Sequence, residues 1–177
     1  MKVAVFCSSS NKVDDKYKKD AYKIGKQLAL AGHSLVFGGG QHGLMGQVAK
    51  GVKDNGGYVL GVNINLFNDP EINFPRCDKL TIVETINERK DIMINEADAF
   101  LILEGGFGTY DEMCDVLERK DLSFICKPII IYNGNHYYDD LISFIEKCYQ
   151  KNFCMQPLES ICKIACNIKD ITKLLEE

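Results

Sequence analysis

The sequence predicts an α/β fold, a single Rossmann-like domain in which a parallel sheet carries helices on both faces. Short apolar runs alternate with amphipathic stretches along the whole chain, and this alternation is typical of covered parallel sheets. Two of the apolar runs end in glycine clusters that lead directly into helices. The length of 177 residues suits one compact domain, so we expect a single domain over residues 1–177.

The first half of the chain alternates between strands and helices, except that a polar stretch without a helix separates the strands 58–62 and 80–83. The expected strands are 2–6, 35–37, 58–62 and 80–83. The expected helices are 14–31, 44–55 and 85–97. The first of these helices repeats apolar residues on one face and is followed by Gly32, a typical helix stop. The polar stretch 63–79 contains two prolines, and its length predicts a functional loop rather than a linker.

The second half continues the same pattern. Strands are expected at 99–103, 128–132 and 163–167. Helices are expected at 109–120, 137–150 and 169–176. The sequence contains no internal repeat and no low-complexity segment, so nothing divides it into smaller units.

The charge and the apolar runs of the sequence limit the kinds of partner that we expect for this protein. The net charge is −4, and the densest basic group, Lys16, Lys18 and Lys19, is interleaved with aspartates. That pattern favours a solvated helix face over a nucleic-acid footprint. No apolar run reaches the length of a membrane span, so we expect neither nucleic acid nor membrane as a partner.

The eight cysteines are scattered, and none forms a C-x-x-C pair or a cluster with zinc-ligand spacing. The first residues read as a strand and a turn, with no signal peptide. We therefore expect free thiols in a cytoplasmic protein that holds no metal and no cofactor. Only Cys7, directly after the first strand, is placed to face a ligand, and no histidine is placed to activate it as a nucleophile.

The most informative segment is AFLILEGGFGTYDE at 99–112. A strand runs into a glycine-rich turn, and the turn opens into a helix, so backbone N–H groups and a helix N-terminus meet at one point. Such a point binds phosphate well. It makes Gly105, Gly106, Gly108 and Thr109 candidate phosphate-binding residues and places the Glu112 carboxylate beside the ligand. The alternative is structural, because Thr109-x-x-Glu112 also reads as a capping box, with Asp111 and Glu112 suiting the helix dipole.

A second glycine cluster lies in LVFGGGQHGLMG at 35–46. Here too a strand leads into glycines, and a helix follows from about Leu44. In a parallel sheet both turns lie at the carboxyl ends of strands, where ligands bind at a topological switch point. Two such units predict one nucleotide or phosphosugar gripped by both. The alternative is a pair of tight turns with glycine chosen only for positive φ.

Neither glycine cluster has the spacing of the best-known nucleotide motifs. The G-x-G-x-x-G pattern of dinucleotide-binding proteins is missing, and so is the G-K-[ST] of P-loop proteins. The sequence therefore disfavours a hydride-transfer enzyme and a P-loop ATPase.

Two cations flank the apolar stripe of the helix expected from Thr85, which carries its own capping box with Glu88. Arg89 and Lys90 either extend over the core with their heads in water or bind an anionic ligand. An arginine can hold phosphate or sugar oxygens in a bidentate manner.

Three segments taken in order, GGGQHGLMG, NERKDIM and EGGFGTYDE, resemble the LONELY GUY family of cytokinin riboside 5′-monophosphate phosphoribohydrolases. This family is often labelled, misleadingly, as lysine decarboxylases. The resemblance runs from CSSS at 7–10 to the helix near residue 150. Two positions depart from the family pattern: Glu104 stands where the family has proline, and Asn87 where it has histidine.

The resemblance implies a Rossmann-like, nucleotide-binding homodimer that acts in cytokinin biosynthesis and needs no cofactor. It implies cleavage of the N-glycosidic bond of an AMP-like purine nucleoside 5′-monophosphate, N6-modified ones included, to free base and ribose 5-phosphate. The matching catalytic positions are Arg89 and Glu112. The matching substrate-binding positions are Gly38, Gly39, Gly40, Gly43, Met45, Gly46, Lys90, Gly105, Gly106, Gly108 and Thr109.

A different class stays open, that of a non-catalytic nucleotide or molybdenum-cofactor carrier on the same fold. The glycine turns would serve both classes, whereas a carrier needs no carboxylate beside the sugar, so Glu112 and Arg89 discriminate between them. A decarboxylase is disfavoured because no lysine lies in a recognisable pyridoxal-phosphate context. Glu104 is expected to loosen its turn and to oppose an incoming phosphate, so Glu104→Pro is expected to tighten nucleotide binding.

Overall fold

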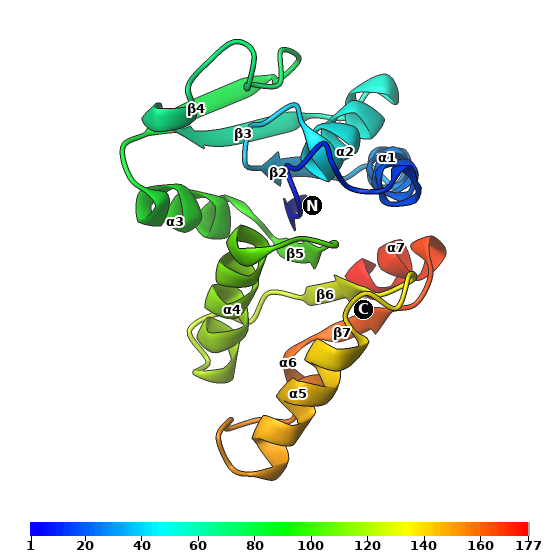
Figure 1. Ribbon diagram of the computed structural model, residues 1–177, viewed down its shortest axis with the longest axis vertical. Coiled ribbons are helices and arrows are strands. Elements are labelled where there is room, and N and C mark those ends of the chain that lie inside the picture. Colours follow the sequence, from blue (N-terminus) through cyan, green and yellow to red (C-terminus); the bar gives the residue numbers. More distant parts are fainter. Residues whose placement is uncertain (177) are drawn as a thin grey trace.

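The computed structural model describes residues 1–176 and has the expected α/β architecture. One seven-stranded sheet runs through the molecule in the order β4-β3-β2-β1-β5-β6-β7 (Figure 1). Every neighbouring pair of strands is parallel. The strands are β1 (Lys2–Phe6), β2 (Ser34–Phe37), β3 (Val59–Ile64), β4 (Lys79–Val83), β5 (Ala99–Ile102), β6 (Ile129–Tyr132) and β7 (Lys163–Ala165).

Helices alternate with the strands, as the sequence predicts. They are α1 (Asp15–Leu30), α2 (Gly43–Asp54), α3 (Ile86–Glu96), α4 (Phe107–Asp121), α5 (Asp139–Gln150), α6 (Leu158–Ile161) and α7 (Ile168–Glu176). A single 3-10 turn, Asn65–Phe67, follows β3. None of the helices within residues 1–176 has the length and apolar character that a membrane span requires.

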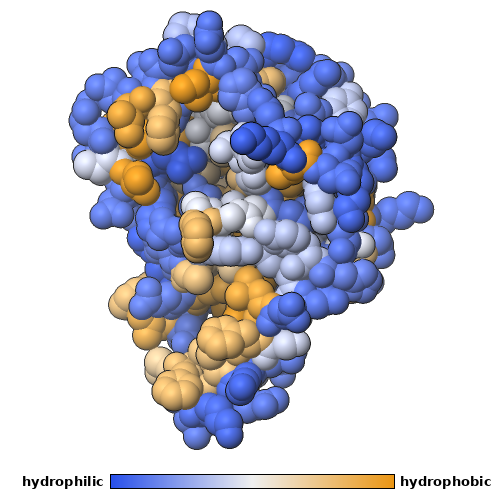
Figure 2. Space-filling model, in the orientation of Figure 1, coloured by the Kyte–Doolittle hydropathy of each residue, from blue (hydrophilic) through white to orange (hydrophobic). Residues whose placement is uncertain are grey.

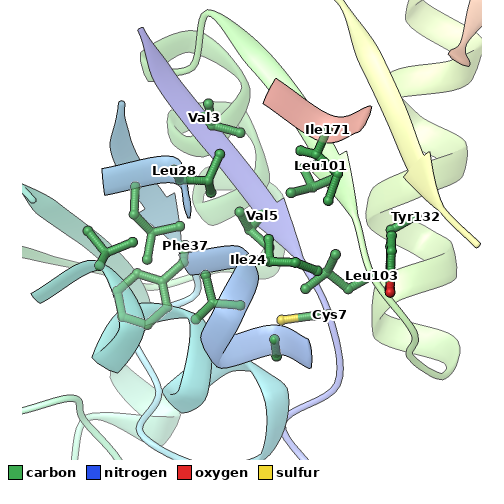
Figure 3. Close-up of a cluster of buried hydrophobic side chains, with 14 of the residues drawn as sticks. Val3, Val5, Cys7, Ile24, Leu28, Phe37, Leu101, Leu103, Tyr132 and Ile171 are labelled. Atoms are coloured by element: carbon green, nitrogen blue, oxygen red, sulfur yellow. The ribbon is translucent and has the colours of Figure 1, made fainter. Parts of the chain in front are cut away.

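Two apolar layers form the core, one on each face of the sheet. One layer packs α1, α2 and α7 against the sheet: Ile24 and Leu28 of α1 and Ile171 of α7 surround Val5 of β1 and Leu101 of β5 (Figure 3). The other layer packs α3, α4, α5 and α6 against the opposite face. Because both faces are covered, β5 and β6 are buried at every residue, which explains their continuous apolar sequence.

Several boundaries differ from the prediction, and one difference matters for the site. α4 begins at Phe107 rather than at residue 109, with Gly106 as its N-cap. β3 continues to Ile64, so the polar stretch after it starts later than expected. The short helix α6 has no counterpart in the prediction, because four residues are too few to display a helical period.

The remaining shifts lie at element ends. α2 begins at Gly43, one residue before the prediction, and α5 begins at Asp139, two residues after it. β7 ends at Ala165. These changes are of the size expected from fraying and from tertiary contacts at element ends.

The strand order places a topological switch point at β1. The chain builds outward from β1 through β2, β3 and β4 on one side, and through β5, β6 and β7 on the other. The loops after β1, β2 and β5 consequently diverge at the carboxyl edge of the sheet and leave a crevice between them.

Candidate functional site

A pocket of about 590 Å³ occupies that crevice. Its walls come from the loops after β1, β2 and β3, from the first turn of α4, and from one side of α3. The lining residues are Cys7, Ser8, Ser9, Ser10, Gly38, Gly40, His42, Met45, Asn63, Ile64, Phe67, Ile72, Ile86, Arg89, Gly106, Phe107, Gly108, Thr109, Asp111 and Glu112.

An ion pair between Arg89 and Glu112 lies at the wall of this pocket. Arg89 Nη1 donates to Glu112 Oε1 at 2.9 Å, and the two side chains are 16% and 9% exposed. Arg89 Nε donates to the carbonyl oxygen of Val62, at 3.0 Å. The guanidinium is thus held at two points, and its Nη2 group makes no hydrogen bond within residues 1–176.

Burial raises the pKa of Glu112, and the adjacent Arg89 only partly offsets this effect. A carboxyl in an apolar wall favours its neutral form, whereas a nearby cation favours the ionised form. Such competing effects on one buried group are common at catalytic sites. Glu112 is therefore the pocket residue best suited to proton transfer or to stabilising a cation.

The first N–H groups of α4 have no hydrogen-bond acceptor within residues 1–176. The backbone N–H groups of residues 106–109 make no hydrogen bond to any other group in the described chain, and these four residues line the pocket. Unpaired N–H groups at a helix N-terminus carry partial positive charge and bind anions. The geometry therefore provides an anion site directly beside Glu112.

The capping-box alternative for Thr109 and Glu112 is wrong. The N-cap is Gly106, so Thr109 lies inside the helix and Glu112 lies beyond the first turn. Glu112 bonds to Arg89 instead of to a backbone N–H. The capping box at Thr85 and Glu88 is confirmed, with both reciprocal hydrogen bonds present.

Two glycines of this turn have no steric reason to be glycine. A Cβ added at Gly106 or Gly108 would meet no atom within 4 Å, and neither has a positive φ. The choice of glycine at these two positions is explained by the space it leaves for an approaching ligand, and it is not explained by the geometry of a tight turn. Gly105 differs, because a Cβ there would lie 2.0 Å from Thr109 Oγ1.

At the N-terminus of α2, by contrast, the first N–H groups are already bonded to other parts of the protein. Gly43 N donates to Asn11 Oδ1 at 2.9 Å, and the N–H groups of Leu44 and Met45 donate to the carbonyl oxygen of Ser8 at 2.9 and 3.2 Å. Protein acceptors already occupy the α2 amides, so this second strand–glycine–helix unit reaches the pocket through Gly38, Gly40 and Met45 and not through its helix N-terminus. This unit contributes pocket walls instead.

Gly38 makes room for the ion pair. A Cβ at Gly38 would lie 1.9 Å from Arg89 Nη2 and 3.0 Å from Met45 Cε. Because φ of Gly38 is not positive, the need for glycine here comes from the guanidinium rather than from the backbone.

The structure brings eight of the thirteen sequence-predicted residues to the pocket wall: Arg89, Glu112, Gly38, Gly40, Met45, Gly106, Gly108 and Thr109. Gly39, Gly43, Gly46, Gly105 and Lys90 lie outside it. The four glycines have structural reasons: the positive φ of Gly39 and Gly43 favours glycine, and a Cβ at Gly46 or at Gly105 would overlap Gln41 or Thr109.

Lys90 is engaged in ion pairs on α4. Its Nζ lies 3.0 Å from Asp111 Oδ1 and 3.2 Å from Asp115 Oδ2. Lys90 thus joins α3 to α4 through these ion pairs and does not line the pocket, so its role as a substrate-binding residue stays a prediction.

Sequence reasoning missed the walls that come from loops without glycine. Ser8, Ser9 and Ser10 follow β1, and Asn63 lies in β3, one residue before its end. A signal existed for the serines, because they follow a strand whose carboxyl end reaches the switch point. Cys7 lines the pocket as expected, and burial raises the pKa of its thiol, which suits an inert side chain.

Glu104 turns away from the pocket. It is buried and does not line the cavity, and its Oε1 accepts a hydrogen bond from Asn135 Nδ2 at 3.0 Å. The expectation that its charge faces an incoming phosphate is wrong, because the loop after β6 provides a partner on the far side. Asn87, the second departure from the family pattern, is exposed and lies outside the pocket wall.

No cluster of His, Cys, Asp or Glu side chains within residues 1–176 is arranged to hold a metal ion. All eight cysteines are free. Besides the carboxyl–guanidinium pair and the anion site, the pocket wall offers the Asp111 carboxylate, the His42 imidazole, the Cys7 thiol and several hydroxyl and amide groups.

Together the fold and the pocket define a Rossmann-like α/β protein with an anion site at the switch point of its sheet. Known proteins with this architecture include the molybdenum cofactor carrier protein of Chlamydomonas reinhardtii, whose solved structure matches with a TM-score of 0.76 at 20% identity. That match covers 99% of this chain and 98% of the other. At this identity it shows a shared fold only.

Sequence relatives define the family. A model of the family described as "Possible lysine decarboxylase" matches residues 45–175. A rice (Oryza sativa subsp. japonica) protein named "Probable cytokinin riboside 5′-monophosphate phosphoribohydrolase LOGL5" is 36% identical, over 99% of this chain and 72% of its own length. An Arabidopsis thaliana cytokinin riboside 5′-monophosphate phosphoribohydrolase is 34% identical, over 99% of this chain and 83% of its own length. The chain belongs to this family, the LONELY GUY family, as its three motifs indicate.

Proposed function

We propose that this protein hydrolyses the N-glycosidic bond of a purine nucleoside 5′-monophosphate, releasing the free base and ribose 5-phosphate. The observation that carries the proposal is the largely buried Arg89–Glu112 pair beside the N–H groups of residues 106–109, which have no partner within the described chain, all in one pocket. The names of the relatives support the same reaction class.

The phosphate is proposed to bind at the α4 N-terminus, where four N–H groups and the helix dipole favour an anion. Binding energy from this remote group orients the ribose over Glu112. A nucleoside that lacks the phosphate would forgo that energy, which accounts for selectivity toward monophosphates.

Cleavage breaks the bond between C1′ and the base nitrogen, and positive charge develops on the ribose. The Glu112 carboxylate stabilises that charge and either takes a proton from the attacking water or attacks C1′ itself. Water supplies the hydroxyl at C1′, and the departing base takes up a proton. Arg89 holds the carboxylate in place and offers its Nη2 group to ribose or base oxygens and nitrogens.

The carrier alternative leaves the ion pair unexplained, since a carrier needs no buried carboxylate at the sugar. A decarboxylase activity finds no support in this pocket, because none of its lining residues within 1–176 is a lysine. Pyridoxal-phosphate chemistry requires such a lysine.

Release of free base from a panel of nucleotides tests the proposal. AMP and N6-substituted AMP are expected to be cleaved, and adenosine is expected to be a poor substrate. Glu112→Gln should lower kcat by roughly 10²- to 10⁴-fold, with Arg89→Ala also strongly impaired. Glu118→Gln, an exposed residue on the same helix, is the matched control. Near-wild-type turnover by Glu112→Gln, or equal turnover of AMP and adenosine, would overturn the proposal.

A homodimer in the cytoplasm is part of the proposal. Large apolar side chains exposed on the surface support an interface between copies: Phe124, Phe144, Phe153 and Met155 are exposed, and apolar residues gather over the end of the molecule that contains α5 (Figure 2). Light scattering on the purified chain should give twice its mass of 19.9 kDa. A monomeric mass at micromolar concentration would contradict this part.

A further inference from the structure

The loop after β6 holds the turn that precedes α4 from behind. Three consecutive residues of the turn are each bonded to it. Tyr138 Oη donates to the carbonyl oxygen of Leu103 at 2.7 Å, and Asn135 Nδ2 donates to Glu104 Oε1 at 3.0 Å. Tyr137 Oη donates to the carbonyl oxygen of Gly105, at 2.7 Å.

This loop is itself well anchored. Asn133 is buried and bonds through its side chain to the N–H of Tyr138 and to Asp139, at 2.8 and 2.6 Å. The ring of Tyr137 packs edge-on against the ring of Tyr138, with centroids 4.9 Å apart. The hydroxyl that reaches Gly105 therefore projects from a fixed platform.

The bond from Tyr137 sets the orientation of one particular peptide. The peptide between Gly105 and Gly106 is trans, so its carbonyl and its N–H point to opposite sides. With the carbonyl fixed on Tyr137, the N–H of Gly106 points away from Tyr137, and Gly106 lines the pocket. A peptide flanked by two glycines has few steric restraints on its rotation, so an added bond is needed to hold it.

Tyr137 is suited to donate that bond. Its hydrogen bond with Tyr110, together with burial, raises the pKa of Tyr137 to about 12, so the hydroxyl keeps its proton near neutral pH. Tyr137 itself does not line the pocket. Its effect on a ligand is therefore exerted through the peptide it holds.

We infer that Tyr137 is a positioning residue of the anion site: its hydroxyl locks the Gly105–Gly106 peptide with the Gly106 N–H facing the 5′-phosphate. This inference rests on the proposed function for the identity of the anion. Without the lock, the peptide populates both orientations, and affinity falls with the fraction in the binding orientation.

Tyr137→Phe tests the inference, with Tyr110→Phe as the matched control, because the Tyr110 hydroxyl forms a hydrogen bond only with that of Tyr137 within residues 1–176. Binding of ribose 5-phosphate is measured by calorimetry, and KM and kcat are measured with AMP and adenosine. Tyr137→Phe should weaken ribose 5-phosphate roughly 3- to 10-fold and raise KM for AMP by a similar factor. Its kcat, its kcat/KM for adenosine and its melting temperature should stay close to wild type.

Unchanged affinity in Tyr137→Phe would overturn the inference, and so would an equal loss in Tyr110→Phe or an equal loss with adenosine. A wild-type protein that binds ribose 5-phosphate but releases no base contradicts the proposed function alone, and the comparison of the two tyrosine variants still decides the inference. A wild-type protein that binds neither ribose 5-phosphate nor inorganic phosphate would contradict both.

Discussion

The two strand–glycine–helix units of this chain look alike in sequence and differ in what their helix amides bind. At α2 the first amides are bonded to Asn11 and to Ser8. At α4 the corresponding amides of residues 106–109 have no partner in the described chain. We call the unit before α2 the closed unit, because the protein itself bonds its amides, and the unit before α4 the open unit, because its amides face the pocket without a partner in the described chain.

The glycines of the two units differ in the same way. Gly43 and Gly46 are required for packing, since a Cβ at Gly43 would lie 2.6 Å from the backbone of Ser9. Gly106 and Gly108 have open space around them. A glycine-rich turn alone therefore does not identify an anion site. A better indicator of an anion site is a glycine at a position where neither a positive φ nor the packing of neighbouring atoms excludes a larger residue.

Among the variants that test this comparison, Gly38→Ala is expected to have the largest effect, because it disturbs the ion pair between Arg89 and Glu112. A Cβ would overlap Arg89 Nη2 and displace the guanidinium from Glu112. Because misplacement of a catalytic group by about 1 Å costs about 10²-fold, kcat/KM for AMP should fall by roughly that factor. The free energy of unfolding, measured in urea, should change little. Wild-type kinetics in Gly38→Ala would show that the guanidinium position does not matter.

A matched pair of glycine variants separates the closed unit from the open one. Gly46→Ala places a Cβ against the oxygen of Gln41 and should lower the free energy of unfolding by about 1–3 kcal/mol. Gly106→Ala meets no protein atom, so it should keep its stability and lose affinity for ribose 5-phosphate. The comparison fails if Gly106→Ala is the less stable variant, or if it binds ribose 5-phosphate as tightly as wild type.

The pH dependence of kcat/KM probes Glu112. Burial raises its pKa above the ordinary 4.5, and the carboxylate is the active form in the proposed reaction. Activity should therefore fall on acidification at a pH above 4.5. Initial rates with AMP, measured between about pH 4 and about pH 8, locate this acid limb of the pH–activity profile. An acid limb at or below the ordinary glutamate value would contradict a buried Glu112.

The smallest effect concerns Glu104, which lies behind the open unit. Burial raises its pKa, so the folded state holds the proton more tightly than the unfolded chain. Stability is then lost as pH rises through the folded pKa. Glu104→Gln removes this loss and should raise Tm by roughly 1–3 °C at about pH 8, with the gain vanishing below the ordinary value of 4.5. A larger gain in acid would reverse the sign and contradict the assignment.

Much of the fold follows from the sequence, because buried parallel strands leave continuous apolar runs such as those of β5 and β6. The site is less predictable. Arg89 and Glu112 come from motifs, and the structure brings them within 2.9 Å. The start of α4 and the bonding of the α2 amides depend on contacts between distant residues, such as Ser8 with Leu44. The ion pairs of Lys90 depend on such contacts too, since its partners Asp111 and Asp115 lie on another helix.

The central claim is that the open unit, and not the closed one, holds the phosphate of a nucleotide. A crystal structure of Glu112→Gln with AMP tests it most directly, because this variant is expected to bind AMP and to cleave it far more slowly than the wild-type protein does. The account predicts phosphate oxygens at about 3 Å from the N–H groups of residues 106–109, with C1′ facing residue 112. A phosphate seated against residues 38–46, or an AMP molecule outside the pocket, would contradict it.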